Sequence, residues 1–125
     1  MIYLDTHVAA ELTQGETRRF SRRALSAIER DDDVRISPMV LLELDFLYEI
    51  QRTKLSAEDA LKILAKSFGL RVCDRPFAEI VHQAAEEGWT RDPFDRIIVA
   101  QARLGKAMLI TRDTTIQAHY SRARA

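Results

Sequence analysis

The chain has 125 residues, of which 46% are hydrophobic and 30% are charged, a composition typical of one globular domain spanning residues 1–125. Its 19 basic and 19 acidic residues cancel, which argues against a protein that holds nucleic acid through a general positive field. The single cysteine, Cys73, excludes an internal disulfide, and no apolar stretch is long enough to span a membrane. We therefore expect a cytoplasmic protein that does not enter a membrane.

Short apolar runs alternate with helical patterns along the chain. In chain order, the sequence predicts a strand at 2–4, helices at 6–13 and 20–32, a strand at 34–37, a helix from Ser37-Pro38 to about Gln51, a helix opened by Ser56, a strand at 70–73, a helix from Pro76 to Gly88, a helix from Pro93 to about Gly105, a strand at 107–111 and a short helix over 114–120. This alternation is typical of an α/β fold with a parallel sheet covered by helices on both faces.

The segment "WTRDPFDR" (89–96) places two aspartates on either side of a proline, just before the apolar run "IIVAQA". Asp92 fits the N-cap of a helix whose first residue is Pro93, and Asp95 would then lie in its first turn, near the positive end of the helix dipole. Capping accounts for both acids without any chemistry. Whether they also serve a reaction depends on where the other acids of the chain lie.

Three further acids are expected at the same edge of the sheet as Asp95. Asp5 follows the first strand, Asp113 follows the last predicted strand, and Glu43 lies in an otherwise mostly apolar stretch of helix after the second strand. Open parallel sheets bind ligands at the carboxyl ends of their strands. Asp5 and Asp113 could each cap the helix that follows, and Glu43 could be rescued by a helix edge or an arginine. These separate explanations do not account for four acids at one edge.

Carboxylates that share a site repel one another unless cations neutralise them. Mg²⁺ or Mn²⁺ prefers oxygen ligands, and one or two such ions can activate water for phosphodiester hydrolysis. None of His7, His82 and His119 has a second ligand at a zinc-binding interval, and we expect His7 to be a core or helix-surface residue.

Four motifs together resemble the PIN domain, and in particular the VapC-type ribonuclease toxins. They are "IYLDTHV", "ISPMVLLELDFL", "RDPFDRIIVAQA" and "LITRDTTI", in the order and spacing of that family, and they span nearly the whole chain. The resemblance implies a three-layer α/β/α domain with a central parallel sheet of four short strands. A fifth strand is expected to be short or absent because the chain ends at "HYSRARA".

The resemblance also implies roles for the acids. It makes Asp5, Glu43, Asp95 and Asp113 the catalytic, metal-binding set, with Asp92 beside them, chiefly as the N-cap. Thr6 and Thr111 would orient a carboxylate or bind metal through water, although burial at a helix start and a strand end explains them equally well. Arg96 could pair with an acid or face phosphate, and we expect the ion pair.

The implied activity is that of an Mg²⁺- or Mn²⁺-dependent endoribonuclease acting on RNA such as tRNA or rRNA. A small antitoxin of VapB type would silence it, commonly by inserting an arginine into the acid cluster, and the toxin would be a homodimer. The alternative is a PIN-domain nuclease of RNA processing without an antitoxin. A receiver-like phosphate-binding module is disfavoured, because the paired acids and the lysine that it needs are missing. With zero net charge, RNA affinity would rest on metal and a few arginines, which could equally form an antitoxin surface or a solvated helix face: Arg18, Arg19, Arg22 and Arg23.

Overall fold

The computed structural model describes all 125 residues and contains one sheet of five short parallel strands. The strands are β1 (Ile2–Leu4), β2 (Val34–Ile36), β3 (Arg71–Val72), β4 (Met108–Ile110) and β5 (Ala123–Arg124). Their order in the sheet is β3-β2-β1-β4-β5. β1 is therefore central, with Ile2 opposite Val34 of β2 on one side and Met108 of β4 on the other.

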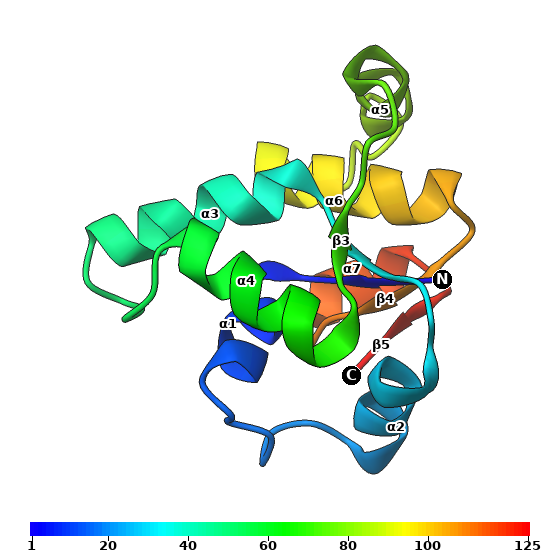
Figure 1. The fold of residues 1–125 in the computed structure, drawn as a ribbon. Coiled ribbons are helices and arrows are strands. Elements are labelled where there is room, and N and C mark those ends of the chain that lie inside the picture. Colours follow the sequence, from blue (N-terminus) through cyan, green and yellow to red (C-terminus); the bar gives the residue numbers. More distant parts are fainter.

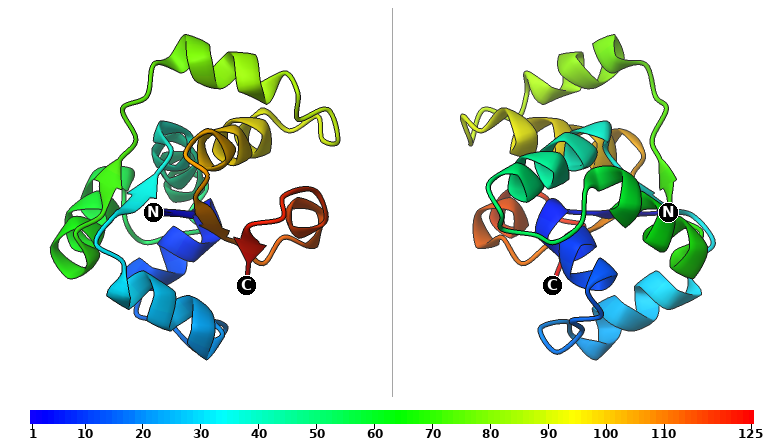
Figure 2. Two further views of the ribbon diagram at one scale, coloured as in Figure 1. Left: turned by 90° about the vertical axis from the view of Figure 1, so that its right-hand side faces the viewer. Right: turned by 60° about the vertical axis from the view of Figure 1, so that its left-hand side comes forward.

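Seven helices surround this sheet, as Figure 1 shows. They are α1 (Thr6–Thr13), α2 (Arg22–Arg30), α3 (Pro38–Glu49), α4 (Ala57–Phe68), α5 (Phe77–Ala84), α6 (Pro93–Leu104) and α7 (Thr114–His119). Helices α3 and α6 cover one face with α5 outside them, α1 and α2 cover the other face, and α4 and α7 lie toward the two edges (Figure 2). None of the helices has the length and apolar character that crossing a membrane requires. The predicted three-layer α/β architecture is confirmed.

Serine side chains and prolines mark the starts of α3, α4 and α6. Ser37 Oγ accepts a hydrogen bond from the Met39 amide at 3.0 Å, and Ser56 Oγ accepts one from the Asp59 amide at 3.2 Å. Pro38 and Pro93 occupy first-turn positions, where a missing N–H costs no helical hydrogen bond. These starts are the ones predicted from the sequence.

Several boundaries differ from the prediction. Helix α2 begins at Arg22, after Ser21 has capped it, and α3 ends at Glu49. Pro76 is the N-cap of α5, not its first residue, and α5 ends at Ala84, four residues before Gly88. A short fifth strand is present, because the amides of Leu109 and Thr111 bond to the carbonyls of Arg122 and Arg124.

Candidate active site

Asp5 is held at the carboxyl end of the central strand by bonds to both of its oxygens. Its side chain is buried, with a relative exposure of 5% for the residue. Oδ1 accepts a hydrogen bond from the Thr6 amide at 2.8 Å, so Asp5 caps α1 as well as following β1. Oδ2 accepts one from Thr111 Oγ1 at 2.6 Å. Thr111 follows β4, so this bond ties together the ends of two neighbouring strands.

Glu43 reaches the same place from α3. Its carboxylate accepts a short hydrogen bond from Thr6 Oγ1. Burial raises the pKa of Glu43, the Thr6 hydrogen bond lowers it, and the charges of Asp5 and Asp92 raise it further. A threonine, not an arginine, therefore makes the half-buried charge of Glu43 tolerable.

Asp92 and Asp95 differ in their hydrogen bonds. Asp92 has the capping role that the sequence suggested for it. Asp92 Oδ1 accepts the amides of Phe94 at 2.8 Å and Asp95 at 3.4 Å, so Asp92 is the N-cap of α6. The Asp95 carboxylate is half-buried and accepts no hydrogen bond from the protein. Capping therefore explains Asp92 and leaves Asp95 unexplained.

Asp113 is the N-cap of α7. Its Oδ1 accepts the amides of Thr115 at 2.8 Å and Ile116 at 3.0 Å. Its own amide donates to Thr111 Oγ1 at 3.1 Å, which links Asp113 to the threonine that holds Asp5.

The five acids lie close enough to act on one another electrostatically. Burial raises the pKa of Asp95 from 3.8 to about 7, and the charges of four acids raise it further, in the order Asp92, Asp5, Asp113 and Glu43. The structure thus gathers every acid singled out from the sequence around Asp95. As the side chains lie, however, no three His, Cys, Asp or Glu residues are arranged to hold one metal ion.

A second network beside the acids was not foreseen. The Arg112 amide donates to His7 Nε2 at 3.2 Å, and His7 Nδ1 lies 3.6 Å from Asp5 Oδ2. The Arg112 guanidinium reaches both carboxylate oxygens of Glu11, at 2.5 and 2.6 Å, and lies over the Phe20 ring. The loop that carries Asp113 is therefore fastened to α1. The sequence offered one sign of this network. Glu11 lies one helical turn after His7, so both side chains are on one face of the helix, and Arg112 directly precedes Asp113.

One expected interaction is wrong. Arg96 forms no ion pair with an acid; its Nε donates to the Thr90 carbonyl at 2.8 Å, in the loop before α6. That backbone oxygen lies within reach of the guanidinium at the helix start. Arg96 therefore braces the loop and leaves the acids without a neutralising arginine from this position.

The family model of the PIN domain matches residues 2–122. The chain belongs to the PIN domain family. Two solved structures share its fold with TM-scores of 0.67 and 20% identity: VapBC2 from Rickettsia felis bound to a DNA fragment from their promoter, and a toxin–antitoxin complex from Klebsiella pneumoniae. The matches cover 94% and 100% of this PIN domain, and 92% and 97% of the respective chains. DNA-bound VapBC from Salmonella typhimurium aligns with a TM-score of 0.60 at 20% identity, over 98% of this chain and 94% of that one. No protein of curated function matches the sequence.

Proposed function

We propose that this PIN domain is a metal-dependent endoribonuclease and the toxin of a VapBC-type toxin–antitoxin pair. The observation that carries the proposal is the state of Asp95, a carboxylate with no hydrogen-bond donor among four other acids. Such a charge is costly to hold without a cation. The fold that it shares with toxins of VapBC complexes supports the toxin assignment over a nuclease of RNA processing.

The ligands of the metal would be Asp5, Glu43, Asp95 and Asp113. Their donors are carboxylate oxygens, which suit Mg²⁺ or Mn²⁺, and the raised pKa of Asp95 indicates that a cation would be favoured there. When bound, one or two such ions would supply an activated water and stabilise the leaving oxygen. The side chains must reorient to close on an ion, because they do not form a ligand set as they lie. Thr6 donates a hydrogen bond to Glu43 and Thr111 donates one to Asp5, so these two carboxylates start from fixed positions.

A small antitoxin of VapB type is the proposed partner, and a basic side chain placed beside Asp95 would relieve the same repulsion that a metal relieves. We also propose a homodimer. Leu42 and Phe46 are 57% and 52% exposed on α3. They line a hollow of about 280 Å³ with Phe94, an apolar surface that association would cover. The single cysteine is buried and unpaired, in keeping with a cytoplasmic protein.

The test is to incubate the purified protein with total RNA, with and without Mn²⁺, and to map the new ends. Asp5→Asn and Asp95→Asn remove a metal-binding charge at constant size, so each is expected to abolish cleavage while the variant stays folded. Asp59→Asn is the matched control, because Asp59 is exposed in the first turn of α4 and lies outside the cluster. Full Mn²⁺-dependent cleavage by either site variant would refute the assignment. A small DNA-binding protein encoded next to this chain, and binding it, would favour a toxin over a processing nuclease.

A further inference from the structure

Several cations without a carboxylate partner line one surface of the molecule, although the net charge is zero. Seven of the 19 basic side chains form ion pairs, which leaves twelve without one. Five of these twelve line two adjoining hollows between α2 and β5: Arg23, Arg30, Lys106, Arg122 and Arg124. We call this surface the α2–β5 groove.

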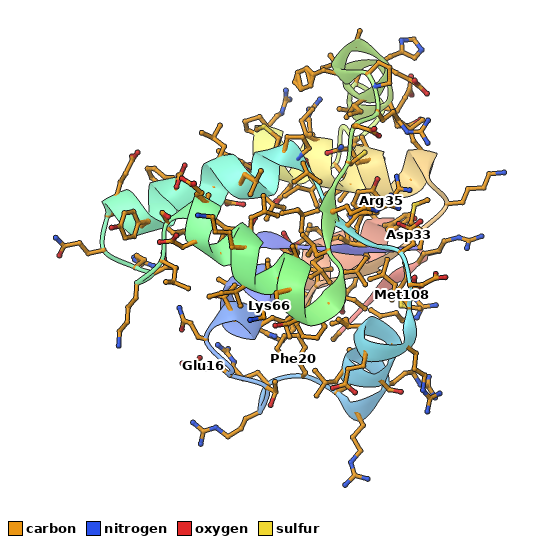
Figure 3. The ribbon with its side chains drawn as sticks, in the orientation of Figure 1. Glu16, Phe20, Asp33, Arg35, Lys66 and Met108 are labelled. Carbon is orange, nitrogen blue, oxygen red and sulfur yellow. The ribbon has the colours of Figure 1, made fainter.

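The two hollows form a continuous surface. The larger, of about 470 Å³, is lined by Arg30, Lys106 and Arg122, and the smaller, of about 360 Å³, by Arg23 and Arg124. Met108 lines both, and Figure 3 shows it beside α2 and β5. Among the lining residues the one acidic side chain is Asp31, which lies 3.3 Å from the amino group of Met1.

One end of the groove adjoins the acid edge of the sheet. The carbonyl of Arg124 accepts the Thr111 amide at 2.8 Å, and the Thr111 hydroxyl holds Asp5. The other end lies at Lys106, before β4, at the amino edge. Helix α2 follows the groove for nine residues, about 14 Å at 1.5 Å per residue. The cations are thus spread over several nucleotides' length.

We propose that the α2–β5 groove binds the phosphate backbone of the RNA on which the acid cluster acts. This rests on the proposed function and adds to it a binding surface outside the acid cluster. Five carboxylates repel a polyanion, so the affinity for RNA has to come from cations elsewhere. Arginine suits this task, because its planar guanidinium binds phosphate through two N–H groups.

The groove fits RNA better than an acidic protein. Protein interfaces have apolar centres, and of the large exposed apolar side chains only Met1 lines the groove. The structure also revises the arginines named from the sequence: Arg19 is paired with Glu11 at 3.4 Å, whereas Arg23 has no carboxylate partner and lines the groove.

The experiment measures RNA binding in EDTA by fluorescence anisotropy across a range of salt concentrations, so that cleavage plays no part. The test variant is Arg23→Glu with Lys106→Glu, since neither side chain makes a hydrogen bond or ion pair that the change would break. The control is Lys54→Glu with Lys66→Glu, which changes net charge equally on exposed, unpaired lysines at and beyond the ends of α4; Lys66 is labelled in Figure 3. The probes are a structured RNA of tRNA size and a short oligonucleotide.

The test variant should bind the structured RNA about tenfold more weakly, with a salt dependence lower by about 1.5 in log–log slope, as expected for two lost phosphate contacts. The control should change far less, and in a separate assay with Mn²⁺ it should cleave the short oligonucleotide at the wild-type rate. The inference would be overturned if both variants lost equal affinity for RNA or if the test variant lost none. It would also be overturned if polyglutamate, but not unlabelled RNA, displaced the labelled RNA from the protein. A wild-type protein that binds RNA through the groove but never cleaves it would refute the proposed function alone.

Discussion

Replacing Asp95 by asparagine should stabilise the metal-free protein at neutral and alkaline pH. Asparagine keeps the size of the side chain and removes the charge that burial and four neighbouring acids oppose. The effect should depend on pH in a defined direction. The folded protein holds the Asp95 proton up to about pH 7, whereas the unfolded chain loses it near 3.8, so the wild-type free energy of unfolding falls as pH rises between these values.

The expected magnitude follows from the same difference. A pKa of about 7 against 3.8 corresponds to about 4 kcal/mol at 1.36 kcal/mol per pH unit. Solvent screening at a half-buried site lowers this to about 2 kcal/mol. Loss of a first-turn carboxylate costs about 0.5 kcal/mol of helix-dipole interaction. We therefore expect Asp95→Asn to raise the free energy of unfolding by about 1.5 kcal/mol at pH 8 and by almost nothing at pH 4.

The assay is urea unfolding in EDTA at several pH values, followed by the fluorescence of Trp89, the single tryptophan. Asp59→Asn is the matched control, because Asp59 has the same position in the first turn of α4 and lies outside the acid cluster. It should lose about 0.5 kcal/mol at pH 8. In Mn²⁺ the order should change, because metal stabilises the wild type by binding the folded state and the variant has lost a proposed ligand.

A variant that is no more stable than the wild type at pH 8, or whose gain is the same at pH 4, would refute the reasoning. A large loss of stability would mean that the Asp95 carboxylate supports the start of α6 after all. Either result would remove the electrostatic argument for a cation site.

Three other changes test separate contacts by the same urea assay. Glu11→Gln should lower the free energy of unfolding by about 2 kcal/mol, because it leaves the partly buried Arg112 without its charged partner. In the double variant with Arg112→Met most of this loss should be recovered, and additive losses would contradict a direct pair. Lys106→Gly should gain about 0.5 kcal/mol, because Lys106 has a φ of +51°, and a loss would show that its side chain stabilises the turn. Gln101→Met should gain about 1 kcal/mol, because the buried amide has no hydrogen-bond partner; a loss would show that the amide is satisfied.

Features that depend on neighbours in the sequence were predictable. Serine or aspartate before proline marked the starts of α3 and α6, because capping is a local interaction. The gathering of the acids was also accessible, since all strands of a parallel sheet end at one edge. The short strand β5 could not be predicted with certainty, because its two residues have no apolar pattern and are held by the backbone of β4.

Contacts between distant residues were beyond the sequence. Glu87 is 2% exposed, and Arg103 and Trp89 donate hydrogen bonds to its two oxygens; nothing local marks it as buried. The pairing of Arg112 with Glu11 joins residues 101 positions apart. The charge of Arg96 alone predicts an acidic partner, whereas its Nε donates to the backbone carbonyl of Thr90.

Capping and chemistry, the two explanations that the sequence leaves open, do not exclude each other for three of the acids. Asp5, Asp92 and Asp113 each use one oxygen to accept amides at the start of α1, α6 and α7. Three helix N-termini therefore face the cluster, and their partial positive charges offset part of the repulsion among the carboxylates. Asp95 and Glu43 accept no such amide, and burial and neighbouring acids raise the pKa of each. The helix starts thus let the chain fold with its acids together, and they leave an unbalanced negative charge at the two positions where a cation would contribute most.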